Sequence, residues 1–203
     1  MNDSELLASI KADERYQRNL DWGKPRRGHP EGSIRAHIEE LEANLKCLAS
    51  QFSEDQITKL QILIHTHDTF KPNAREGNSI RHPESHASLA RSFLAEFCDD
   101  QDLLNMVQFH DEPYALWKRH VSGRHNHSGR FSHLLETIED WDLFNAFLII
   151  DGYTDGKSRA PLRWWFASIQ PFLKSSWQGL DLSKLPSQEM HPGHDSQTDR
   201  DHH

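Results

Sequence analysis

Apolar residues recur at helical spacing along most of the chain. Between residues 33 and 52 they stand three or four positions apart, which places them on one face of a helix: Ile34, Ile38, Leu41, Leu45 and Leu48. A second helix is expected to begin at Ser53, because Ser53 and Gln56 have the spacing of a capping box. Its predicted apolar face contains Ile57, Leu60 and Ile64.

The same spacing predicts further helices downstream. One begins at Pro83, a residue favoured in a first turn, and the next ends before Pro113, which cannot continue a helix. A later helix runs up to Asp151 and is broken by Gly152. No useful stretch alternates between apolar and polar positions as a strand would. The sequence therefore predicts one all-α domain, a bundle of about six helices.

The pattern divides the chain into three regions. Residues 1–28 are expected to form an N-terminal arm, with a short helix at 6–18 and a connector rich in Gly, Pro and Arg at 23–28. Residues 29–182 carry the strong periodicity and are predicted to form the helical domain. Residues 183–203 are polar and aperiodic, which is typical of a disordered tail.

Five polar residues end or interrupt the apolar stripes: His37, His67, Asp68, His110 and Asp151. Burying them costs free energy unless each finds a partner. A single such histidine usually bonds a backbone carbonyl, and a single aspartate usually caps a helix. Together they favour another solution, because one divalent cation satisfies several at once. Imidazole and carboxylate are natural ligands of Zn, Fe and Mn.

Composition and charge limit the kinds of partner that the sequence favours. Hydrophobic residues make up 35% of the 203 residues, and the net charge of −8 disfavours a duplex nucleic acid. Unopposed Lys and Arg between 118–133 and 156–164 suit a small anion. The longest apolar run, 146–150, is too short for a membrane span. The two cysteines, Cys47 and Cys98, lack metal-ligand spacing, which is typical of a reduced, cytoplasmic protein.

The order of the candidate ligands resembles a known family. His37, the adjacent His67 and Asp68, and the distant Asp151 resemble the HD-domain metal-dependent phosphohydrolase superfamily. Lys71 stands in the lysine position of that family's His-Asp-x-x-Lys form. The stretch 29–32 is similar to one in the HD domains of bacterial CCA-adding enzymes. The resemblance covers about residues 29–155 and implies an HD-domain-like helical bundle.

Two further segments resemble the cyclic-dinucleotide phosphodiesterase branch of this superfamily. His82-Pro83-Glu84 is similar to a helix start where that branch binds a second metal, and either His82 or His86 can be the ligand, with motif position favouring His82. His110-Asp111-Glu112 is similar to the branch's His-His-Glu, with Asp111 replacing the second histidine. The Gly-Tyr-Pro element of the branch is absent, which argues against cyclic di-GMP as the substrate.

The resemblance implies a mechanism. His37, His67, Asp68 and Asp151 would hold one divalent metal (Mn, Fe, Zn, Ni or Mg), and a second ion would sit at His82 and His110, with Asp68 bridging. Asp68 and Lys71 are the expected catalytic residues. The phosphate of a small anionic substrate, with a nucleotide the favoured class, would contact four side chains: Lys71, Arg81, Lys157 and Arg159.

Two alternatives remain open from the sequence. The same ligand order is similar to that of di-iron oxygenases of this scaffold, such as inositol oxygenase and the phosphonate-cleaving enzymes. Spacing cannot separate iron-dependent oxidation from two-metal hydrolysis, because the ligand types are the same. The third class is a non-catalytic nucleotide-binding module, which would be expected to show a degraded ligand set.

Overall fold

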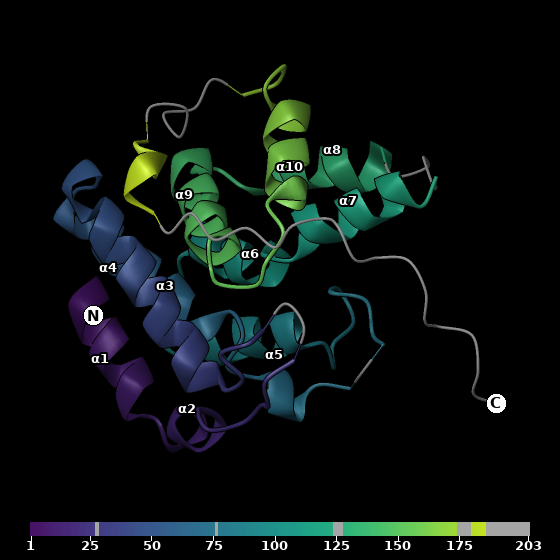
Figure 1. Cartoon of the computed structure of the whole chain (residues 1–203). Coiled ribbons are helices and arrows are strands. Elements are labelled where there is room, and N and C mark those ends of the chain that lie inside the picture. The colour runs from purple at the N-terminus through teal and green to yellow at the C-terminus, as the bar shows by residue number, and fades with distance from the viewer. Residues whose placement is uncertain (27–28, 76, 124–127, 174–179, 186–203) are drawn as a thin grey trace.

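The structure is a computed structural model that describes residues 1–26, 29–75, 77–123, 128–173 and 180–185 (Figure 1). Its α-helices are α1 (Asp3–Ala12), α2 (Glu14–Asn19), α3 (Ile34–Leu48), α4 (Glu54–Thr66), α5 (His86–Leu94), α6 (Gln101–Phe109), α7 (Glu112–Val121), α8 (Ser128–Thr137), α9 (Trp141–Gly152) and α10 (Ala160–Ile169). Short 3₁₀ turns occur at η1 (Ala49–Gln51), η2 (Lys71–Asn73) and η4 (Leu182–Lys184). Within the described residues, β pairing is limited to isolated bridges in the loop before α3.

The predicted all-α bundle is confirmed, with helices that are shorter and more numerous than expected. Capping residues explain the difference. Asp13 ends α1 in an extended conformation, and its side chain then accepts the N–H of Arg15 to start α2. Ser85 accepts the N–H of Ser88 and starts α5 at His86, three residues later than Pro83. No helix in the described ranges is long and apolar enough to cross a membrane.

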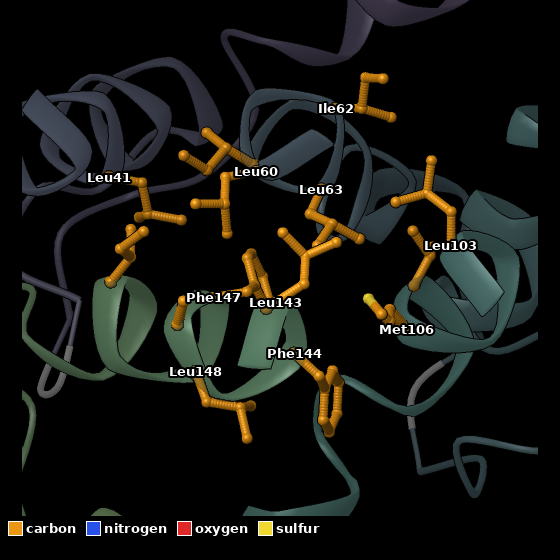
Figure 2. Close-up of a cluster of buried hydrophobic side chains, with 14 of the residues drawn as sticks. Leu41, Leu60, Ile62, Leu63, Leu103, Met106, Leu143, Phe144, Phe147 and Leu148 are labelled. Atoms are coloured by element: carbon orange, nitrogen blue, oxygen red, sulfur yellow. The ribbon is translucent and has the colours of Figure 1, made fainter. Parts of the chain in front are cut away.

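The core lies where four helices meet. Figure 2 shows side chains of α3, α4, α6 and α9 gathered into one cluster, with Leu41, Leu63, Met106 and Phe147 among them. The helix α9 is buried along most of its length, since nearly every residue from Trp141 to Ile150 is inaccessible to solvent. It packs on both α3 and α4. A helix that is apolar all round belongs at the centre of a fold, and α9 occupies that position.

The N-terminal segment is part of this bundle. The helix α1 lies along α4, and Leu6, Leu7 and Ile10 are buried against it (Figure 1). Tyr16 of α2 is also buried, and its hydroxyl lies 2.6 Å from Nδ1 of His65 in α4. Residues 1–26 therefore contribute to the core, although the apolar pattern of this short, interrupted segment was expected to mark only an arm.

The boundary of the predicted tail falls inside ordered structure. The turn η4 covers Leu182–Lys184, and Leu185 beyond it is only 6% exposed and belongs to the core cluster. Asp181 donates its backbone N–H to the side chain of Gln51. Residues 186–203, most of the segment predicted as a disordered tail, lie outside the described residues.

Truncating Ile10 tests whether the N-terminal helices belong to the folding unit. Ile10 is fully buried, so Ile10→Ala should lower the free energy of unfolding by roughly 2–5 kcal/mol, the usual cost of such a cavity. Val121→Ala is the control, because Val121 is 60% exposed. Denaturant titration of both variants measures the difference. Equal stability of the two variants would mean that α1 is not part of the core.

Candidate metal centre

The adjacent His67 and Asp68 lie at the end of α4 and are both buried. The Nδ1 atom of His67 lies 3.1 Å from the carbonyl oxygens of Leu63 and of Ile64. Because a carbonyl only accepts, Nδ1 carries the proton, and Nε2 keeps a lone pair. That lone pair lies 3.5 Å from Oδ2 of Asp68 and has no hydrogen-bond partner. Two facing lone pairs repel each other, and a cation between them removes the conflict.

His37 and Asp151 meet this pair from two other helices. His37 stands in the first turn of α3, and its Nε2 lies 3.8 Å from Oδ2 of Asp68 and 3.1 Å from Oδ1 of Asp151, near the end of α9. The ligand atoms of His37, His67 and Asp68 all lie within 4.8 Å of one another. Three helices thus bring four predicted ligands to one buried place, with Asp151 joining through its contact with His37.

A second group lies on the other side of Asp68. Oδ1 of Asp68 is 3.6 Å from Nε2 of His86 and 3.5 Å from Nε2 of His110, and the two imidazole nitrogens are 3.2 Å apart. Asp111 lies beside them, with Oδ2 3.4 Å from His86 and 3.7 Å from His110. Tetrahedral ligands at about 2.0–2.1 Å from a cation stand about 3.4 Å apart, which is close to these spacings. Asp68 therefore presents one oxygen to each group.

His86, and not the favoured His82, belongs to this second group. His82 is exposed, and its Nδ1 accepts the backbone N–H of Glu84 at 3.1 Å. The cause is the helix start, because capping by Ser85 makes His86 the first residue of α5. The chain from 82 to 85 is a turn, in which the N–H of Ser85 donates to the carbonyl of His82. Motif position alone pointed one helical turn too early.

The charges of the centre suit cation binding. Burial raises the pKa of Asp68, but the ammonium of Lys71 and the ring of His67 outweigh it and hold the pKa well below its usual range. Burial likewise raises the pKa of Asp151, and Lys157 and His37 lower it more. Burial lowers the pKa of His67. Near neutral pH both carboxyls are thus ionised and His67 is neutral, which are the forms that bind metals.

Two of the four expected phosphate contacts lie at the centre. Lys71 bonds Oδ2 of Asp68, and the Nζ atom of Lys157 lies 2.7 Å from Oδ1 of Asp151. Arg81 is exposed and its guanidinium lies 5.5 Å from the centre of the Phe109 ring.

Arg159 has a structural role in the loop after α9. It is 4% exposed, and its guanidinium donates to four backbone carbonyls: Gly152, Tyr153, Thr154 and Lys157. These bonds shape the loop that presents Lys157 to Asp151. Arg159 therefore acts on the centre through the loop, where the sequence predicted a contact with substrate.

A small cavity of about 20 Å³ adjoins the centre. His37, Asp68 and Lys71 line it together with residues of the loop before α3, including Trp22 and Arg26. A larger cavity of about 670 Å³ lies elsewhere, around Lys59 and the start of α9. Its acidic side chains are used within the fold. Asp100 and Asp140 cap α6 and α9, and Asp102 accepts two backbone N–H groups.

Comparison with known proteins adds nothing to this geometry. No protein-family model matches the chain, and no curated protein or solved structure matches it either. The buried His/Asp cluster is compatible with the HD pattern and could bind metal.

Two residues near the centre had no predicted role. Asp111 was noted only as a replacement in a motif, and Glu31 only as part of a resembling stretch. Asp111 directly follows His110 at the end of α6, so proximity in sequence was a usable signal. Glu31 lies on a loop, where periodicity does not indicate which way a side chain points.

Metal removal and addition test the centre directly. After treatment with a chelator, Mn²⁺ or Zn²⁺ should raise the melting temperature, because an ion at 100 times its Kd stabilises the folded state by about 2.7 kcal/mol. Asp68→Ala should abolish the shift, since Asp68 contacts both groups. Glu39→Ala, on the exposed side of α3, is the control. A full shift in Asp68→Ala would exclude a cation at this site.

His82, in the turn before α5, and His86, the first residue of α5, allow a matched comparison of metal content. We expect two ions per chain in the wild type and in His82→Ala, and one in His86→Ala, because only His86 faces Asp68 and His110. Elemental analysis after metal loading and gel filtration gives the count. One ion in the wild type, or two in His86→Ala, would contradict a second position built on His86.

Proposed function

We propose that the protein is a metal-dependent phosphohydrolase of the HD type that acts on a small phosphoester, with a nucleotide as the expected substrate. The observation that carries the proposal is the gathering at one place of three buried polar atoms without hydrogen-bond partners: Nε2 of His37, Nε2 of His67 and Oδ1 of Asp68. Such atoms are costly in a core unless an ion satisfies them. All three belong to the cluster around Asp68.

The donor set defines two adjoining cation positions. His37, His67, Asp68 and Asp151 would hold one ion, and His86, His110 and Asp68 would hold the other, with Asp111 beside it. A divalent transition metal or Mg²⁺ bound there supplies the usual chemistry of such sites, in which water is activated and a phosphoryl oxygen is polarised. The mixture of imidazole and carboxylate suits Mn, Fe, Zn and Ni better than Mg.

The lysines supply the contact with phosphate. In the structure Lys71 and Lys157 each neutralise one carboxylate of the cluster. A divalent cation on the same carboxylate repels the ammonium group, and the flexible stem of lysine lets it turn toward a bound phosphate. Both side chains are only partly buried, so they can make this movement. Their charge would stabilise the negative charge that develops on the phosphoryl oxygens.

Trp22 supports a substrate with an aromatic ring. It is 42% exposed and, like Arg26, is one of the residues that line the small cavity at the centre. An exposed indole could stack on a nucleobase. Phe70, which follows Asp68 by two residues, packs on Phe93 with the ring centres 4.9 Å apart.

A di-iron oxygenase is the second candidate. The observation that favours it is the sharing of Asp68 between the two groups, because a bridging carboxylate also suits two irons. The metal content of protein purified without added metal separates the two. Two irons per chain would favour the oxygenase, and Mn, Zn, Ni or Mg would favour the hydrolase.

Activity measurements test the hydrolase. With Mn²⁺, the protein should release phosphate from simple phosphoesters or nucleotides, and a chelator should abolish the release. Asp68→Ala should reduce turnover to background, and Lys71→Ala should lower kcat/KM by about 10²–10³-fold, as for loss of one electrostatic contact to the transition state. Lys46→Ala, an exposed lysine of α3, is the matched control. Full turnover in Asp68→Ala would refute the assignment.

A further inference from the structure

The histidines of the cluster differ in what lies beside their second ring nitrogen. His67 and His110 donate from Nδ1 to backbone carbonyls of their own helices, at 3.1 Å from Leu63 and 2.8 Å from Val107. His37 makes no such bond, since its Nδ1 is buried without a hydrogen-bond partner. The ring of His37 therefore depends on a group from outside its helix.

That group is the carboxylate of Glu31. Its Oε1 lies 3.2 Å from Nδ1 of His37, and the Glu31 side chain is only 5% exposed. The same oxygen accepts from Nδ1 of His29 at 3.0 Å, while Oε2 has no partner. Burial raises the pKa of Glu31, but the contacts with His29 and His37 outweigh it and lower the pKa, so the group is ionised.

The loop that carries Glu31 has a defined shape. Gly32 adopts φ +81°, and a Cβ atom there would lie 2.8 Å from the backbone nitrogen of Pro25. Gly23 pairs with Ser33 in an isolated bridge, and the N–H of Ile34 donates to the carbonyl of Trp22 at 3.0 Å. These contacts bring Glu31 to His37 by close backbone packing.

We propose that Glu31 is a positioning residue of the metal centre, whose carboxylate accepts the Nδ1 proton of His37 and directs Nε2 toward Asp68 and Asp151. The inference rests on the proposed metal function. A cation at Nε2 requires the proton of the neutral ring to be on Nδ1, and Nδ1 is buried without a hydrogen bond. Oε1 of Glu31, 3.2 Å from Nδ1, is the acceptor within reach. His29 holds the same carboxylate oxygen.

A third cation is the competing occupant. The ligand atoms of His29, Glu31 and His37 also lie within 4.8 Å of one another. An ion there would use Nδ1 of His37 while Nε2 serves the neighbouring position, so the ring would have to lose both protons. A ligating histidine ordinarily donates its other N–H to a carboxylate, a carbonyl or water. The positioning role therefore agrees better with the ring's chemistry.

Three variants of the full chain test the proposal. Glu31→Ala should weaken Co²⁺ binding by about 10–100-fold, the usual effect of losing such a contact. Glu31→Gln keeps an oxygen that accepts from Nδ1 and should recover most of the affinity. Glu39→Ala on the same helix-loop segment is the control, because Glu39 is exposed. Titration calorimetry gives the affinities, and melting temperatures of the metal-free variants report on the fold.

A proton NMR spectrum of the Co²⁺ protein provides a readout that a merely structural role would not change. The Nδ1 proton of a ligating His37 should appear as a shifted exchangeable signal, present in the wild type and Glu31→Gln and lost by fast exchange in Glu31→Ala. If Glu31→Ala does not fold, His29→Ala should still weaken binding several-fold and speed this exchange.

The outcomes separate this proposal from the proposed function. A wild type that binds no Co²⁺ refutes the metal centre itself. Wild-type affinity and an unchanged proton signal in folded Glu31→Ala refute only the positioning role, as does wild-type behaviour of His29→Ala. A third ion in the wild type that is lost in His29→Ala also overturns it, in favour of a ligand role for Glu31.

Discussion

The buried carboxylate of Asp68 is the constraint on which the arrangement depends. An ionised carboxylate in a helical core is costly unless opposite charge and hydrogen-bond donors surround it. Lys71, His37 and His110 supply these from different parts of the chain, all within 4.0 Å of the Asp68 oxygens. The helices α3, α4 and α6 must approach one another closely at this point. The apolar contacts among them in the cluster of Figure 2 provide the free energy that offsets the cost.

Helix geometry then determines where the imidazole rings of the metal centre point. A histidine near the end of a helix can donate from Nδ1 to a carbonyl one turn earlier, as His67 and His110 do. The opposite nitrogen is thereby turned out of the helix, toward Asp68. His37 makes no such bond, and the loop before α3 instead brings Oε1 of Glu31 to within 3.2 Å of its Nδ1. The centre thus has two histidines oriented by backbone and one by a side chain.

Periodicity predicted those residues whose direction depends only on their own helix. His37, His67, Asp68 and Asp151 were identified because they end apolar stripes, and the structure brings them together. The choice between His82 and His86 depended on which residue capped α5, and Ser85 decided it locally. Contacts that form only when distant segments fold against each other have no sequence period. The packing of α1 on α4 belongs to this class. The contacts of Arg159 with loop carbonyls and of Glu31 with His37 are local, but they lie on loops, where periodicity does not indicate the direction of a side chain.

The proposed function would link cation binding to phosphate binding through charge. The buried carboxylates of Asp68 and Asp151 are stabilised by nearby positive charge. In the structure this charge comes from Lys71 and Lys157. The same carboxylates also favour the protonated form of His110. Burial lowers the pKa of His110, but Asp111 and Asp68 outweigh burial and raise it. In the proposed function, a divalent cation bound to these carboxylates would supply the same positive charge and would displace both the proton and the ammonium groups. The displaced lysines are then available to an anion at the centre, so a phosphate would bind more tightly to the metal-loaded protein. The coupling is reciprocal, and phosphate would in turn raise the affinity for the cation.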